Sequence, residues 1–244
     1  LSKCFQSPFG RVFDNSNPFP QAEEGFYFGL SLYPFEKFSI NSFKIIKNDL
    51  WRTYFDELPK MKDELFVEFN YQPNKISLLT RMRIKDHEYF NEPWIGNSIT
   101  RSIEQQKIYR IQIDYEPAKQ FLFRTRWEST DIEIVNEKGS YLFEDIHFSP
   151  FSKLSVRTRI LFYRTDSYNS RLYEYESDLP GSYANYAVYG EGRIFYLLVK
   201  WKIHEQISIW FKYRYNNIYK RDLTPDIIRA DDNTLQRTTR FQIK

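Results

Sequence analysis

The chain has 244 residues, of which 19% are aromatic and 27% charged, and its mean hydropathy is −0.62. No stretch of about 18 consecutive apolar residues occurs, which excludes a transmembrane helix. The net charge of +3 is too small to indicate nucleic acid or an anionic surface as a partner, and the single cysteine, Cys4, excludes an internal disulfide framework.

The start of the chain differs from the rest. It opens at Leu1 with neither a methionine nor an apolar signal region, so we expect a piece of a longer, processed protein. Because no signal region precedes it, Cys4 does not fit a lipoprotein acylation site. We interpret residues 1–24 as an N-terminal extension or a partial first strand, and residues 25–244 as one β-domain.

From residue 25 onward, apolar residues recur at every second position, as in Phe26, Phe28, Leu30 and Leu32. This period predicts β-strands with two different faces, and the segments are longer than the usual strand of about 5–6 residues. Around Glu144 and Asp145 the alternation breaks, which suggests a β-bulge. The expected strands fall within residues 26–33, 38–40, 65–71, 78–84, 109–115, 121–128, 141–148, 154–162, 195–203, 207–214 and 233–244.

A turn motif separates these segments: an aromatic residue, then a proline, then a lysine. Its prolines are Pro34, Pro73, Pro117 and Pro150, at a spacing of roughly 40 residues, which suits two long strands, one tight turn and one long loop. Residues 203–206 occupy the same place without a proline. We therefore expect these turns at one end of the strands and long polar loops at the other, around residues 47–63, 85–101, 163–192 and 219–232.

Long strands with one apolar and one polar face, short turns on one side and long loops on the other are typical of outer-membrane barrels. We therefore predict an all-β, transmembrane, antiparallel up-and-down β-barrel of about 12–16 strands, of which about eleven lie in this chain. The protein is expected in the bacterial outer membrane with lipid as a partner. A soluble β-sandwich, which also alternates, is the other interpretation of the pattern.

The polar face is mostly basic. Its carboxylates, Glu68, Asp114 and Glu128, are fewer than its cations. One interpretation is a ladder of ion pairs with these and loop acids; the other is a cationic lumen that attracts anions or holds an acidic plug or partner. The eleven cations, which we call the basic stripe, are Arg81, Arg83, Arg110, Arg124, Arg126, Arg157, Arg159, Lys200, Lys202, Lys212 and Arg214.

Two segments resemble a known family. Residues 165–182 (TDSYNSRLYEYESDLPGS) and 189–198 (YGEGRIFYLL) are similar to the C-terminal outer-membrane barrel region of Bacteroidetes-type helix-hairpin-helix domain proteins. Residues 51–56 resemble another loop of that family in their first positions only. The resemblance covers about residues 25–244 and implies a barrel without an established enzymatic or transport role. No helix-hairpin-helix module is visible in this chain, so no residue here is expected to bind nucleic acid.

Catalytic motifs are not apparent. The three histidines, His87, His147 and His204, are scattered, and no nucleophile elbow, zinc-protease motif or phosphate loop occurs. Residues 166–169 and 231–233 offer oxygen ligands without the spacing of a calcium loop. We therefore expect no enzymatic activity, no metal site and no cofactor.

The leading functional hypothesis is a non-enzymatic barrel that serves as a structural or accessory subunit of an envelope complex for secretion, membrane-protein assembly or DNA handling. Its expected partners are other envelope proteins, bound through a tyrosine-rich loop containing Tyr183, Asn185, Tyr186 and Tyr189. The alternative is an anion-preferring channel or transporter that uses the basic stripe.

Overall fold

The structure is a computed structural model that describes residues 23–49, 60–91, 100–220 and 234–243. The expectations for residues 1–22, including Cys4, and for residues 51–56 and 231–233 lie outside this part of the chain. The described part contains β-strands and no helix, and therefore no helix that is long and apolar enough to cross a membrane. The strands are β1 (Glu23–Phe35), β2 (Phe38–Asp49), β3 (Lys60–Tyr71), β4 (Ile76–Asn91), β5 (Thr100–Ala118), β6 (Phe121–Ile132), β7 (Glu137–Phe151), β8 (Leu154–Thr165), β9 (Leu172–Glu176), β10 (Ala184–Val188), β11 (Glu191–His204), β12 (Ile207–Lys220) and β13 (Thr234–Ile243).

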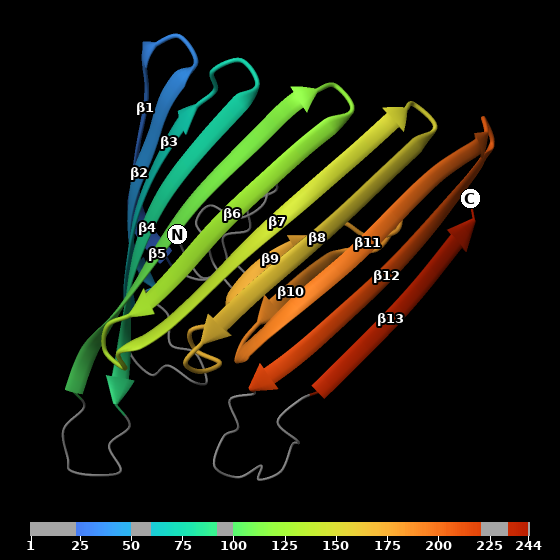
Figure 1. Cartoon of the computed structure of the whole chain (residues 1–244). Coiled ribbons are helices and arrows are strands. Elements are labelled where there is room, and N and C mark those ends of the chain that lie inside the picture. Colours follow the sequence, from blue (N-terminus) through green and yellow to red (C-terminus); the bar gives the residue numbers. More distant parts are fainter. Residues whose placement is uncertain (1–22, 50–59, 92–99, 221–233, 244) are drawn as a thin grey trace.

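Eleven of these strands form one antiparallel sheet in the order β1-β2-β3-β4-β5-β6-β7-β8-β11-β12-β13. Each strand pairs with the next one along the chain, except that β8 pairs with β11. The sheet curls, and the separate two-stranded hairpin β9–β10 lies inside the curl (Figure 1). The expected up-and-down arrangement of about eleven strands is confirmed; β1 and β13 are the edges of the described sheet and are not paired with each other.

The register gives the sheet two chemically distinct faces, since directly paired residues point to the same side. One row joins Glu68, Arg81, Arg110, Glu128 and Tyr141 across β3–β7. These residues lie on the face that carries the hairpin, which we call the concave face. The opposite, convex face carries the apolar residues that alternate with them.

The β1–β2, β3–β4, β5–β6, β7–β8 and β11–β12 turns lie at one end of the sheet, whereas the short β6–β7 turn lies at the other (Figure 1). Neighbouring turns are linked by backbone hydrogen bonds: the Lys37 carbonyl accepts from Gln72 N at 2.8 Å, and the Lys75 carbonyl accepts from Glu116 N at 2.8 Å. The Lys153 carbonyl accepts from Lys202 N in the same way at 2.7 Å. The prediction that the proline turns share one end with residues 203–206 is confirmed.

Three of the motif prolines lie just before the turn rather than in it. The register shifts between Leu32 and Phe35, between Tyr115 and Ala118, and between Phe148 and Phe151, and these shifts contain Pro34, Pro117 and Pro150. A shift of this kind leaves a residue outside the ladder, which is where a residue without an N–H is tolerated. The β11–β12 turn has a similar shift between Lys202 and His204 without a proline.

Two expectations from the sequence were wrong. No bulge occurs at Glu144 and Asp145, because both pair in regular register with β6 and β8. Glu144 lies on the convex face, where it accepts a hydrogen bond from the Thr125 hydroxyl, and this polar contact explains the broken pattern. Residues 163–192 are not a plain loop either: β8 continues to Thr165, β11 begins at Glu191, and residues 166–189, which we call the inner hairpin, fold back onto the concave face.

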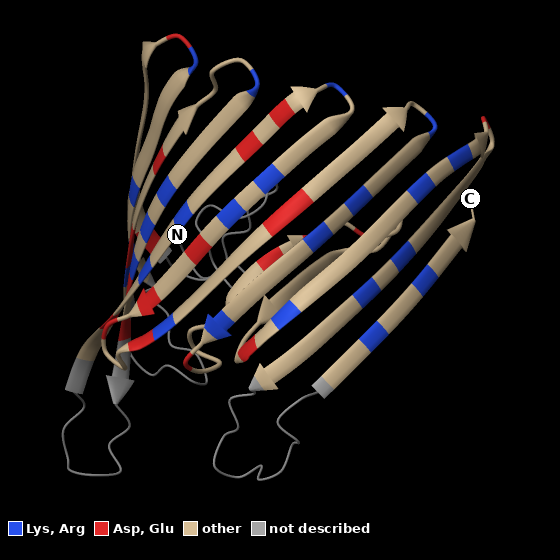
Figure 2. Cartoon of the chain, viewed as in Figure 1, with Lys and Arg blue, Asp and Glu red and all other residues tan. Residues whose placement is uncertain are grey.

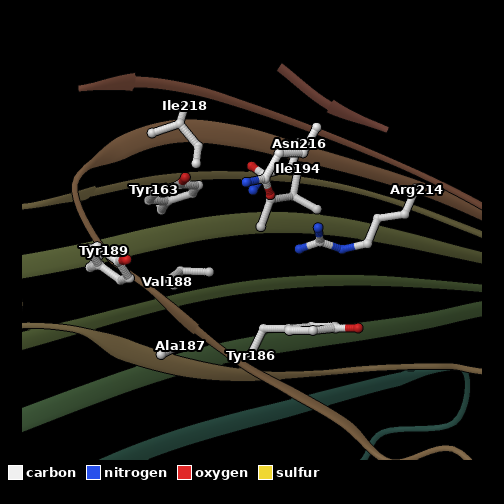
Figure 3. Close-up of a pocket in the computed structure, with 10 residues that line it drawn as sticks. Tyr163, Tyr186, Ala187, Val188, Tyr189, Ile194, Arg214, Asn216 and Ile218 are labelled. Atoms are coloured by element: carbon white, nitrogen blue, oxygen red, sulfur yellow. The ribbon is translucent and has the colours of Figure 1, made fainter. Parts of the chain in front are cut away.

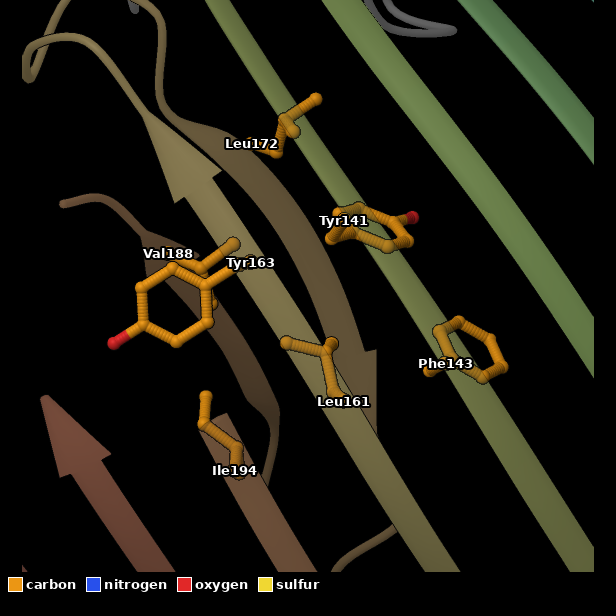
Figure 4. Close-up of a cluster of buried hydrophobic side chains, with 7 residues drawn as sticks. All are labelled: Tyr141, Phe143, Leu161, Tyr163, Leu172, Val188 and Ile194. Atoms are coloured by element: carbon orange, nitrogen blue, oxygen red, sulfur yellow. The ribbon is translucent and has the colours of Figure 1, made fainter. Parts of the chain in front are cut away.

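The best-packed core lies between the inner hairpin and the sheet (Figure 4). Leu172 and Val188 of the hairpin contribute to one buried cluster with side chains of β7, β8 and β11. The other members are Tyr141, Phe143, Leu161, Tyr163 and Ile194. Burial of these side chains holds one side of the hairpin against the sheet.

Gly139 provides a test of this packing. A Cβ added there would lie 2.2 Å from the backbone carbonyl oxygen of Ser170, so Gly139→Ala should lower the free energy of unfolding by about 1–3 kcal/mol, the range typical of overpacking. Gly29→Ala is the matched control, because its closest contact is the exposed ring of Tyr27 at 3.0 Å, which is free to rotate away. Urea unfolding in detergent measures both; equal losses would contradict the close approach.

Candidate functional site

The strands on the C-terminal side of the sheet have a charge imbalance. β8, β12 and β13 contain no aspartate or glutamate, and β11 contains only Glu191 at its first position. In Figure 2 these strands accordingly carry bands of Lys and Arg with almost no acid among them. Their concave face therefore needs carboxylates from another part of the chain.

The inner hairpin supplies those carboxylates. In β9, Glu174 and Glu176 alternate with Tyr173 and Tyr175, so both glutamates point toward the sheet and both are only 4% exposed. The strands β9 and β10 contain no basic residue. The hairpin thus presents an acidic face to a basic wall.

Glu174 binds the middle of the sheet. It accepts hydrogen bonds from Arg126 Nη1 at 2.9 Å and from Arg159 Nη1 at 2.8 Å. The Tyr141 hydroxyl donates to it at 2.8 Å. One hairpin carboxylate therefore joins β6, β7 and β8.

Two further acids bind the C-terminal side. Glu176 accepts from Lys212 Nζ at 3.2 Å and from Arg214 Nε at 3.0 Å. Asp178, just beyond β9, pairs with Lys212 at 3.4 Å and with Arg240 at 3.1 Å. Together with Glu174, these residues form what we call the carboxylate latch: Glu174, Glu176 and Asp178 on the hairpin against Arg126, Arg159, Lys212, Arg214 and Arg240 on the sheet.

Arg159 and Lys212 are the two most enclosed cations of this group, and Arg159 has the larger set of partners. Its side chain is 6% exposed, and besides Glu174 it binds Asp145 Oδ2 at 2.6 Å. Its guanidinium lies 4.0 Å from the ring centroid of Phe143, a cation–π distance. A cation held by two carboxylates and a ring links the sheet directly to the hairpin.

On the N-terminal side of the sheet, cross-strand pairs neutralise the basic stripe without the hairpin. Arg83 Nε donates to Glu64 at 2.6 Å, and Arg124 Nη2 donates to Asp114 at 2.8 Å. Arg81 pairs with Glu68 and Arg110 with Glu128. The expected ladder of ion pairs is present here, and sequence reasoning missed Glu64 and Asp145 as its members.

Three stripe residues near the tight turns have no carboxylate partner in the described part of the chain. Arg157 donates to the Ser177 hydroxyl, and Lys200 lies 5.6 Å from the Trp210 ring. Lys202 is on the same face at the β11–β12 turn. The register thus places all eleven basic residues on the concave face but divides them into a paired majority and this smaller group.

The four residues expected to form a partner-binding loop are divided by the hairpin. Tyr183 is 81% exposed and Asn185 is also exposed. Tyr186 instead faces the sheet, where Arg214 lies 4.6 Å from its ring, and Tyr189 packs edge-on against Tyr168. Only Tyr183 and Asn185 therefore present open surface to another molecule.

A pocket of about 210 Å³ lies between β10 and the C-terminal strands (Figure 3). Tyr186, Val188 and Arg214 contribute to its wall. The Asn216 side chain also lines it, and its buried Oδ1 has no hydrogen-bond partner among the described residues. The contact between the hairpin and β12 is therefore less complete than the contact with β7 and β8.

The histidines do not form a catalytic arrangement. His147 Nε2 lies 2.8 Å from the Ser155 hydroxyl and 3.1 Å from that of Ser149, contacts that the sequence did not reveal. A nucleophilic serine also needs a carboxylate that orients the imidazole, and no hydrogen bond joins His147 to a carboxylate in the described residues. His87 and His204 lie on other strands, and the described residues contain no group of three or more acidic, histidine or cysteine side chains that could hold a metal ion.

Comparison with models of known protein families gave no match, and a search of curated proteins found no similar sequence. The resemblance to the helix-hairpin-helix proteins thus stays a prediction. The functional argument below depends on the residues and geometry of this chain.

The buried pairs of Arg159 generate a testable difference from an exposed pair. Arg159→Met leaves the buried Asp145 without its ion-pair partner and leaves Glu174 with Arg126 alone as its cation in the described part of the chain, so we expect a loss of about 3–5 kcal/mol in the free energy of unfolding. Arg83→Met is the control, because Arg83 is 34% exposed and its pair should contribute only about 0–1 kcal/mol. Chemical unfolding of both variants measures the contrast, and similar losses would show that Arg159 is not specially enclosed.

Proposed function

We propose that this chain is a bacterial outer-membrane β-barrel that acts without catalysis, as a structural or accessory subunit of a larger envelope complex. The proposal has two parts: the location in the membrane and the role as a subunit. Each is supported by a different surface of the molecule.

The observation that carries the membrane location is the exposed apolar convex face. Large apolar side chains lie open on it from the first strand to the last, including Phe28 at 69%, Ile113 at 45% and Phe241 at 60% exposed. Monomeric soluble proteins rarely expose apolar patches larger than a few hundred Å². A face of this kind, opposite a charged one, fits contact with lipid.

The turn end is consistent with an interface between lipid and water. Tyr33, Tyr71 and Tyr115 lie there with exposed side chains. Lys37 and Lys75 follow in the adjoining turns, beyond the tyrosines. Tyrosine keeps its hydroxyl wet while its ring is in an apolar layer, and lysine extends its amine into water, so these residues suit headgroup height.

Closure of the sheet is part of the proposal. β1 and β13 leave unpaired strand edges in the described sheet, and exposed edges promote aggregation. In a membrane, unpaired backbone groups have no water to bind, so the edges must be joined. We propose a closed barrel of about 12–16 strands in which further strands complete the sheet.

Adjacent residues on opposite faces test the membrane location. Ile111 faces the convex side and Gln112 the concave side of β5. Ile111→Arg should destabilise the folded protein in lipid vesicles by about 2–4 kcal/mol. Gln112→Arg should cost less, because it stays on the wet face and loses only its hydrogen bonds with Arg126 and Asp114. Folding into vesicles followed by urea titration gives both values; an equal or inverted effect would exclude lipid contact at the convex face.

The role as a subunit is supported by the exposed tip of the inner hairpin and by the lack of a catalytic arrangement in the described residues. Tyr183 and Asn185 are exposed together, and Tyr175 lies 5.7 Å from the Tyr183 ring. Aromatic residues of this kind are enriched in protein interfaces. No residue of this chain is proposed to bind nucleic acid.

Extraction in a mild detergent tests the complex. We expect the protein to migrate as a discrete assembly larger than the barrel alone, and Tyr183→Ser with Asn185→Ala to release it. Tyr168→Ser is the control, because Tyr168 packs against Tyr189 at the other end of the hairpin. A monodisperse monomer from the native membrane would exclude the subunit role.

An anion channel remains the second candidate because of one observation. Arg157, Lys200 and Lys202 form a basic group near the tight turns without carboxylate partners in the described residues. Cations that line a wet path favour anions. The paired state of the remaining stripe residues, however, gives no continuous cationic path in this conformation.

A further inference from the structure

The inner hairpin is not needed to connect β8 with β11. These strands are direct neighbours in the sheet and pair as far as Arg164 and Glu191. Just beyond that pair, Thr165 N donates to the Gly190 carbonyl at 2.7 Å, and Gly190 N donates to the Thr165 hydroxyl at 2.8 Å. The ends of the inner hairpin are therefore already joined, and a two-residue turn could replace residues 166–189.

The hairpin is nevertheless placed by specific charges. All three latch acids point at cations of the sheet, and four different strands supply those cations: β6, β8, β12 and β13. Removing the hairpin would leave Lys212 and Arg214 with no carboxylate in the described part of the chain. The acidic hairpin and the basic wall are thus complementary over the whole width of their contact.

The two sides of the hairpin differ in how firmly they are held. Toward β7 and β8, Leu172 and Val188 belong to the buried apolar cluster. Toward β12, the pocket of about 210 Å³ and the unpartnered Asn216 Oδ1 leave the contact mainly to ion pairs. The attachment to the C-terminal strands therefore depends on Glu176 and Asp178.

We propose that the inner hairpin is a plug that obstructs the barrel interior and is held in place by the carboxylate latch. This inference depends on the proposed membrane barrel. Inside a barrel, a segment folded onto the wall narrows the path for solutes, and its acids cancel the charge of the cations beneath it. Release of the latch would open the path and uncover Arg126, Lys212, Arg214 and Arg240, whose carboxylate partners among the described residues are all latch acids, so the opened interior should select anions.

The experiment compares variants of the full chain that have been reconstituted in planar lipid bilayers. Glu174→Gln with Glu176→Gln removes two latch charges and preserves side-chain shape. Glu133→Gln is the matched control, because Glu133 pairs with Lys107 at a partly exposed site outside the latch. A third variant replaces residues 166–189 by Asn-Gly, which opens the interior even if apolar contacts keep the uncharged hairpin docked.

We expect low conductance from the wild type and from Glu133→Gln. The double glutamine variant and the excision variant should conduct more, with reversal potentials shifted toward anion selectivity. Unchanged conductance in an excision variant that inserts into vesicles would overturn the plug while leaving the barrel proposal intact. Failure of the wild type itself to insert into lipid would overturn the barrel, and the plug with it. Increased conductance without anion selectivity would overturn the assignment of the four cations to the uncovered path.

Discussion

The contact between Glu174 and the sheet is the interaction on which the interior of this protein depends. This one carboxylate binds Arg126 and Arg159 and accepts a hydrogen bond from the Tyr141 hydroxyl. It therefore connects three strands to a segment that is not part of the sheet. Removing a carboxylate buried among cations leaves them uncompensated, a cost that exceeds the net value of the pair itself. The arrangement of the concave face therefore follows from how its cations are neutralised.

The sheet uses two solutions to that problem. On the N-terminal side, acids on neighbouring strands pair with the arginines directly, as Asp114 does with Arg124. On the C-terminal side, the strands hold almost no acids, and the carboxylates that pair with their cations come from the inner hairpin, which is distant in sequence. A local cross-strand pair is fixed by register, whereas a pair with a folded-back segment is separable from the sheet. This difference is why the hairpin, and not the ladder, is the candidate for a movable part.

The two faces of the sheet are stable in opposite kinds of surroundings, one apolar and one aqueous. The convex face exposes aromatic and aliphatic side chains over every region of the sheet, which water disfavours. The concave face holds buried and half-buried charges that an apolar medium would disfavour. Lipid outside and a wet, largely charge-paired interior provide both kinds of surroundings, which is the physical basis of the proposed location.

The period-two alternation determined from sequence the strands, their two faces and the side to which each stripe residue points, and the proline motif determined that its turns share one end. The alternation failed at Glu144, where a carboxylate on the apolar face is satisfied by Thr125, since side-chain hydrogen bonding is invisible to a hydropathy pattern. It also failed at residues 166–189. The alternation of tyrosine and glutamate in β9, followed by a glycine, Gly181, was a sequence signal for a hairpin, and Gly181 does adopt a positive φ of 82°. The buried face of β9 is acidic, however, so the segment did not have the hydrophobic pattern of a core strand. Only the tertiary structure decided that these acids meet the cations of β6, β8, β12 and β13, because those partners are 15 to 62 residues away along the chain and only the curl of the sheet brings them together.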